Sequence, residues 1–226
     1  MYSLWKLIEK NFKFFQLKKH FSNNTSIHTP SPIITISREM GAGGHPIAEL
    51  VVKKLGKPWK LYHENLLDQI AKSTKLRKEL IKEIDERKRP MIEELIYDIL
   101  GKKYLTLSSY YRHLVHTLAM IGKRGYAVIV GRGANFILKD ALKVRIICEM
   151  KQRIDWEIEF EKISREEAIK RIKESDKKRY EFVKTLFNHD IKKAHHYDLI
   201  IKTSKRLSIY DAADAIVMIA KRRFKL

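Results

Sequence analysis

The chain has 226 residues, 44% of them hydrophobic, which fits one large globular domain with an additional tail or insertion. Its apolar runs are far shorter than the roughly 20 residues that span a bilayer, and its N-terminus does not read as a secretory signal. A single cysteine, Cys148, excludes an internal disulfide. We therefore expect a cytoplasmic protein with this thiol buried in a strand.

The formal net charge is +20, with 47 Lys and Arg against 27 Asp and Glu. Such an excess attracts nucleic acid, anionic membrane surfaces and small phosphates. Most of it is lysine spread along helical stretches, which is typical of a solvated surface. The sequence has no zinc-finger spacing, no RNP-like aromatic strand and no basic zipper, so no specific nucleic-acid partner is predicted.

Residues 1–32 differ in composition from the rest of the chain. Segment 1–21 predicts a basic amphipathic helix, because Leu4, Ile8, Phe12 and Phe15 recur at helical spacing among lysines. Residues 22–32 have the composition of a linker. This N-terminal arm (1–32) has three interpretations that the sequence leaves open. It is a membrane-surface anchor, a helix that binds a protein partner, or a segment that packs on its own domain or stays disordered.

A strand, a glycine-rich turn and a helix open the domain at 33–226. The β-branched run at 32–37 predicts a strand, and 45–56 predicts a helix with Pro46 in its first turn and Gly56 just past its end. The turn between them has the outline of a P-loop, but Gly44 and His45 stand where that motif has Lys and Ser or Thr. Glycine N–H groups at a helix N-terminus can still bind phosphate. A generic glycine turn is the alternative.

Strands and helices then alternate along the chain. An extended segment at 58–63 leads into a charged helical region at 64–123, which Pro90 interrupts. Further strands are predicted at 126–131, 143–150 and 197–203, and helices at 165–187 and 208–224. Ser164 and Glu167 predict a capping box at the start of the first of these helices. The alternation predicts an α/β fold with a mostly parallel sheet and helices on both faces.

Four charged residues are candidates for a functional site. Arg132 directly follows the strand at 126–131, where open α/β sheets bind ligands, and its guanidinium can clasp a phosphate bidentately. Asp176 and Arg179 are i, i+3 neighbours, a spacing equally typical of a routine helical ion pair. Arg153 follows a strand, and a local ion pair is again the alternative. The histidines have no third ligand at a convincing spacing, so they predict no metal site.

Together these segments resemble the cytidylate kinase-like family of P-loop nucleoside monophosphate kinases. The segments that carry the resemblance are "ISREMGAGGHPIA", "AVIVGRGANFIL", the run 176–179 and "YDLIIKT". The resemblance implies a P-loop three-layer sandwich with an ATP site at the glycine loop. It also implies a helical insertion over a monophosphate site, at about 64–123, and a lid at about 174–192.

The resemblance further implies functions for single residues. Arg132 would contact the phosphate of the acceptor monophosphate, Asp176 would hold its sugar, and Arg179 would close on the phosphoryl group being transferred. Arg153 would bind the nucleotide together with the glycine loop, which contributes Gly41, Ala42, Gly43, Gly44 and His45. ATP and Mg²⁺ are the expected cofactors, and a nucleoside monophosphate, with CMP one candidate, is the expected substrate.

The chain departs from authentic cytidylate kinases at Gly44, at His45 and at Val130, where an acid is usual. Arg38, next to the loop, can replace the missing lysine as a catalytic cation. For the metal, Glu39 lies beside the loop, and Glu64 and Asp68 are the next acids within reach, so the sequence does not choose among these three possible ligands. The sequence therefore leaves an active kinase, an inactive nucleotide-binding regulator, and a basic nucleic-acid- or membrane-binding protein as competing hypotheses. It does not set the oligomeric state.

Overall fold

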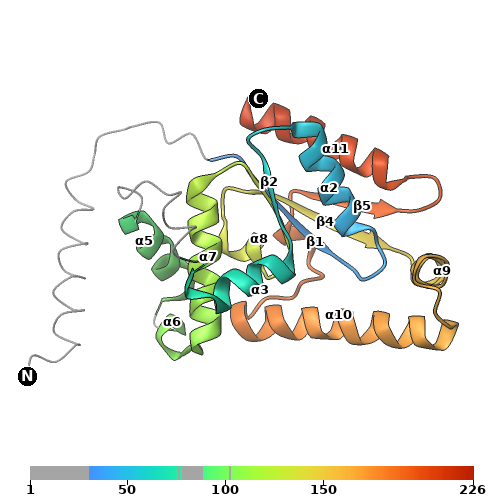
Figure 1. Ribbon diagram of the computed structural model, residues 1–226, viewed down its shortest axis with the longest axis horizontal. Coiled ribbons are helices and arrows are strands. Elements are labelled where there is room, and N and C mark those ends of the chain that lie inside the picture. The colour runs from blue at the N-terminus through green and yellow to red at the C-terminus, as the bar shows by residue number, and fades with distance from the viewer. Residues whose placement is uncertain (1–30, 76, 78–88, 102) are drawn as a thin grey trace, which may run out of the picture.

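A computed structural model describes residues 31–75, 77, 89–101 and 103–226 (Figure 1). The amphipathic helix predicted at 1–21 and most of its linker lie outside these residues. Within the described ranges no helix is long and apolar enough to cross a membrane.

Among the described residues, five parallel strands form one sheet, in the order β2-β3-β1-β4-β5. The strands are β1 (Ile33–Arg38), β2 (Lys60–Tyr62), β3 (Ala127–Val130), β4 (Leu142–Cys148) and β5 (Leu199–Thr203). All four pairings are parallel, so their carboxyl ends share one edge of the sheet. The predicted α/β fold is confirmed, and Cys148 is a buried free thiol at the end of β4.

Successive residues of the central strands pack into two different cores, which produces three layers. Ile33, Ala127 and Ile129 face one core, whereas Ile34 and Val128 face the other. Both faces are buried because helices cover both, as expected for a parallel sheet. The α/β three-layer arrangement therefore follows from central strands that are buried on both faces.

Helices α2 (Gly44–Leu55) and α11 (Ile209–Phe224) cover the second of these faces (Figure 1). Gly43, in the left-handed region with φ 81°, caps the start of α2, and Gly56 with φ 70° follows its end. At the start of α11, Ser208 and Asp211 form a full capping box.

The insertion covers the other face with α3 (Glu64–Lys72), α5 (Arg89–Leu100), α6 (Lys103–Thr106) and α7 (Ser109–Arg124). Pro90, predicted to interrupt the helical region, is the second residue of α5. Proline is tolerated in the first turn of a helix because the N–H it lacks would have no partner there. The short α8 (Ala134–Ile137) packs on the same core.

Two helices follow β4: α9 (Met150–Glu161) and the long α10 (Arg165–Phe187), which runs along one side of the domain (Figure 1). The predicted capping box at its start is half correct. The Ser164 side chain accepts the N–H of Glu167, but the Glu167 carboxylate binds Arg171 at 2.7 Å instead of reaching back. Most of the expected lid at about 174–192 is the C-terminal half of α10, and the turn after it leads to the 3₁₀ turn η2 (Ala194–His196).

Candidate active site

The glycine loop lies at the carboxyl edge of the sheet, between β1 and α2. Two of its glycines have positive φ, 74° at Gly41 and 81° at Gly43. The loop is held from both sides, because Met40 donates its N–H to Asp176 at 2.9 Å and Thr203 donates its hydroxyl to the carbonyl of Ala42 at 3.0 Å. This anchoring fixes the backbone of a turn that has few side chains of its own.

The first turn of α2 leaves backbone donors available at this loop. The first i→i−4 bond of α2 runs from the N–H of Ile47 to the carbonyl of Gly43, so Gly44 and His45 precede it. The first turn carries no acidic side chain that would compete for these donors. His45 itself points to Glu49, 3.3 Å away on the surface. The loop and helix end therefore have the properties of an anion site.

Arg38, the last residue of β1, crosses from this loop to a neighbouring cavity. A Cβ on Gly44 would lie 2.7 Å from the Cβ and Cγ of Arg38. A Cβ on Gly131, at the end of β3, would run into the Nη1 of Arg38. At its far end Arg38 donates from Nη2 to Glu64 at 2.7 Å. The arginine stem thus fills the space that a lysine at position 44 would need.

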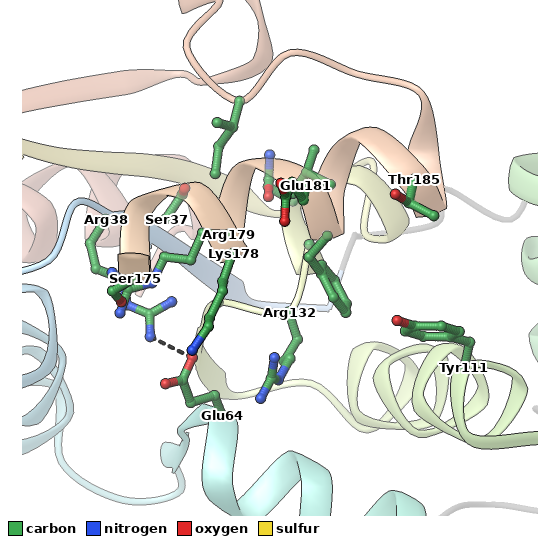
Figure 2. Close-up of a pocket in the computed structure, with 16 residues that line it drawn as sticks. Ser37, Arg38, Glu64, Tyr111, Arg132, Ser175, Lys178, Arg179, Glu181 and Thr185 are labelled. Atoms are coloured by element: carbon green, nitrogen blue, oxygen red, sulfur yellow. Dashed lines mark hydrogen bonds and ion pairs between the residues drawn. The ribbon is translucent and has the colours of Figure 1, made fainter. Parts of the chain in front are cut away.

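The cavity beyond Arg38 has a volume of about 480 Å³ (Figure 2). Its wall comes from the ends of β1 and β3, from α3 and α7, and from the C-terminal half of α10. Four of its side chains are cationic, namely Arg38, Arg132, Lys178 and Arg179. The predicted catalytic residues therefore line one cavity, although they are up to 141 residues apart in the chain (179 − 38).

Arg132 is held firmly at the cavity wall. Its backbone is left-handed, with φ 53°, which is uncommon for a residue with a side chain. Its Nη2 donates to Asp68 at 2.6 Å, and its guanidinium lies 5.6 Å from the ring centre of Phe182. The other oxygen of Asp68 accepts the hydroxyl of Tyr110 at 2.8 Å. Burial and this hydrogen bond raise the pKa of Tyr110 to about 12.

Arg179 faces the cavity from α10 and lies near other positive charge. Burial and the like charge of Arg38 lower the pKa of Arg179 to about 10, although Glu64 and Asp176 act in the opposite direction. It forms an ion pair with Asp176, at 3.5 Å. Two guanidinium groups that repel each other across a cavity favour the binding of an anion between them.

Asp176 and Arg153 are placed behind the glycine loop and do not line the cavity. Arg153 has only 7% of its side chain exposed, donates to the Met40 carbonyl at 2.6 Å, and contacts Asp176 and Glu39. The Asp176 carboxylate accepts from Arg153, Arg179 and the Met40 N–H. Most of the hydrogen-bonding groups of both side chains are therefore used within the protein. In the structure the two residues join α9 and α10 to the loop.

The three acids that the sequence left as candidate metal ligands all form ion pairs with arginines. Glu39 accepts the N–H of Cys148 at 3.0 Å and lies 3.5 Å from Arg153. Glu64 and Asp68 bind Arg38 and Arg132, as above. No group of three metal-binding side chains exists among the residues that the structure describes. These residues therefore do not form a ready-made metal site.

Several polar residues of the site were not singled out from the sequence. Arg145, buried in β4, donates to Ser37 at 3.1 Å and lies 5.5 Å from the ring centre of Tyr197. A charged residue within an apolar strand is a signal that could have identified it. Lys178, Tyr111 and Phe182 line the cavity, but nothing in their local sequence distinguishes them from surface or core residues of a helix.

Comparison with known proteins agrees with this architecture. The profile of the cytidylate kinase-like family matches residues 33–205. An uncharacterized protein from Eubacterium ventriosum is 22% identical, with a TM-score of 0.68 over 85% of this chain and 99% of its own. Shikimate kinase from Acinetobacter baumannii, solved with shikimate, is 15% identical, with a TM-score of 0.42 over 89% of this chain and 95% of its own. No protein of curated function matches the chain in sequence.

Proposed function

The chain belongs to the cytidylate kinase-like family, and we propose that it transfers the γ-phosphoryl group of ATP to a nucleoside monophosphate. CMP is the first acceptor to test, because the family resemblance suggests it. In this proposal the glycine loop holds the donor and the arginine cavity holds the acceptor.

The observation that carries the proposal is the path of Arg38. Phosphoryl transfer depends on positioning and on cations that stabilise charge on the phosphoryl oxygens. The usual lysine is absent at Gly44, but the stem of Arg38 crosses the same space and its guanidinium reaches the cavity. Arg38 is thus placed between donor loop and acceptor cavity, where a transferring group would lie.

The glycine loop fits the phosphates of ATP. A Cβ at Gly43 would lie 2.9 Å from the side chain of Ile209. The loop backbone is therefore closely packed at this point, and a larger residue at position 43 would push the backbone out of place. The N–H groups of Gly44 and His45 and the dipole of α2 would bind phosphate oxygens. Mg²⁺ would be bound mainly by the nucleotide phosphates and water, as is common for this ion. We assign no protein ligand to it.

On the acceptor side, Arg132 would bind the phosphate of the monophosphate and Arg179 would neutralise the phosphoryl group in transit. Arg132 is suited to this because Asp68 and Phe182 orient it while part of its guanidinium stays available. Arg179 reaches the cavity from α10, the helix in which the lid was expected. Asp176, predicted to hold a sugar, already accepts hydrogen bonds from the loop and from two arginines, so it has little acceptor capacity left for a sugar hydroxyl.

A regulatory nucleotide-binding protein without transferase activity is the second candidate. It is favoured by Gly44 and His45 in the loop and by the pairing of Glu39, Glu64 and Asp68 with arginines. Such a protein would still bind phosphate but would lack the cations and metal ligands that stabilise the transition state of phosphoryl transfer.

An ADP-release assay with Mg²⁺ and a panel of ribo- and deoxyribonucleoside monophosphates separates the two. We expect ADP only when an acceptor is present, and a drop of about a thousandfold in Arg179→Ala. Thermal stabilisation by ATP without turnover on any acceptor would instead identify the regulator. Turnover that Arg179→Ala leaves unchanged would contradict the function proposed for Arg179.

A further inference from the structure

Glu64, the first residue of α3, extends its carboxylate into the arginine cavity (Figure 2). One oxygen accepts from Arg38 Nη2 at 2.7 Å. In the close-up, a dashed line joins the Arg38 guanidinium to this carboxylate, and the side chains of Arg132, Lys178 and Arg179 line the same part of the cavity. A negative side chain therefore occupies the region that three cations share.

The charges confirm that all three arginines act on Glu64. Burial by itself works to raise the pKa of the Glu64 carboxyl. The hydrogen bond and charge of Arg38, with the charges of Arg179 and Arg132, outweigh burial and leave the pKa below its ordinary value. Glu64 in turn offsets the repulsion that lowers the pKa of Arg179. The three guanidinium groups thus share this carboxylate as a counterion.

Asp68, one turn later on the same helix, provides the contrast. Both of its oxygens are used, by Arg132 and by Tyr110, and 22% of its side chain is exposed. Glu64 has a single hydrogen-bond donor in the described structure, and 35% of its side chain is exposed. Asp68 is therefore held at the wall by two donors, whereas a single hydrogen bond, from Arg38, holds the Glu64 carboxylate in the cavity.

We propose that Glu64 is an internal stand-in for a phosphate group: its carboxylate occupies the anion position that Arg38 offers in the arginine cavity, and a tetrahedral phosphate dianion takes its place there. Binding displaces the Glu64 carboxylate, because both anions compete for the same donors. The exchange places two negative charges where one was, opposite three guanidinium groups that bind phosphate oxygens well. That this phosphate belongs to a kinase substrate rests on the proposed function, but the site itself requires no turnover.

Inorganic phosphate is the probe, with binding measured by calorimetry in EDTA so that metal ligation is excluded. Glu64→Gln keeps the shape of the side chain and removes its charge. We expect it to bind phosphate about tenfold more tightly than the wild type, because a competing anion is lost. Glu181→Gln is the matched control, since Glu181 lines the same cavity but pairs with Lys177 instead of an arginine. It should leave phosphate affinity unchanged.

Arg38→Met tests the mechanism, because Glu64→Gln added to it should then change phosphate affinity little. Unchanged or weaker phosphate binding in Glu64→Gln, or equal tightening in Glu181→Gln, overturns the proposal. Glu64→Ala, checked for folding by its melting transition, repeats the test if the Gln variant misfolds. Calorimetry with CMP and with ATP identifies the source of the phosphate, since only the ligand that uses this site gains affinity. If Glu64→Gln binds phosphate more tightly but the protein turns over no acceptor, the proposed anion site is supported and the proposed kinase activity is rejected.

Discussion

The glycine loop and the arginine cavity are adjacent, yet they are built in opposite ways. The loop presents backbone, and its own sequence from Gly41 to His45 contains no lysine or arginine. The cavity presents side chains, four of them cationic. Arg38 belongs to both, since it passes Gly44 and ends at Glu64. In the proposed function, the positive charge at the phosphate site therefore comes from the end of a neighbouring strand and not from the loop.

The largest expected effect concerns the cation that links the two regions. Arg38→Ala should lower kcat about a thousandfold, because it removes positive charge from the phosphoryl group in transit. Adding Gly44→Lys to this variant should restore at least about tenfold of that rate, because the lysine then has room at the usual place. The measurement is ADP release at saturating ATP and acceptor.

Gly44→Lys alone is the control for that pair of variants. With Arg38 present, the new side chain meets the Arg38 stem at 2.7 Å, so the free energy of unfolding should fall by about 1–3 kcal/mol. A single Gly44→Lys variant that is as stable as the wild type would show that the two side chains do not share one space.

The loop side of the comparison is tested by Gly43→Val. Positive φ and the closeness of Ile209 should make this variant lose ATP affinity by more than about a hundredfold, since the backbone can no longer approach phosphate. Gly56→Val is the matched control, because Gly56 also has positive φ but no atom within 4 Å of its Cβ position. Calorimetry with ATP should find Gly56→Val unaffected, and normal binding by Gly43→Val would remove the loop from the donor site.

Arg132→Ala tests whether the arginine cavity binds the acceptor monophosphate. Loss of a charged hydrogen-bond donor should raise KM for the monophosphate by about 10- to 100-fold and leave KM for ATP nearly unchanged. Asp68→Asn should also raise KM for the monophosphate more than KM for ATP, but by a smaller factor, because Asp68 acts by orienting Arg132. Equal increases in both KM values would contradict an acceptor-specific contact.

The smallest effect is the pH dependence of stability that Glu64 contributes. Its folded-state pKa is lowered, so the ion pair stabilises the fold above pH 4.5 and is lost as the pH falls through the folded-state pKa. Because the pair is partly exposed, Glu64→Gln should be less stable by at most about 1 kcal/mol at pH 7. Urea unfolding at pH 7 and pH 3 should find a smaller difference at the lower pH, and a constant difference would contradict this.

Much of the fold could be predicted because its signals are local. Apolar runs of four to seven residues gave the positions of β1, β3, β4 and β5, and Pro46 with Gly56 indicated the extent of α2. The capping at Ser164 was only half correct, since whether Glu167 turns back or binds Arg171 depends on competition between two nearby partners. Arg132, Arg179 and Arg38 could be chosen from the sequence as candidate catalytic residues, because they follow strands or lie in the segments that carry the family resemblance.

The sequence by itself determined the parallel three-layer sheet and a lysine-free glycine turn at its carboxyl edge, because strand patterning and glycine conformation are properties of short segments. Only the tertiary structure decided which distant partners Arg38, Arg132 and Arg153 meet. Arg38 finds Glu64 26 residues away, and Arg153 finds Met40 across 113 residues, behind the loop instead of in the cavity. Ion pairs depend on distances of a few ångströms between segments far apart in the chain. Those distances exist only once the sheet has brought its strand ends together.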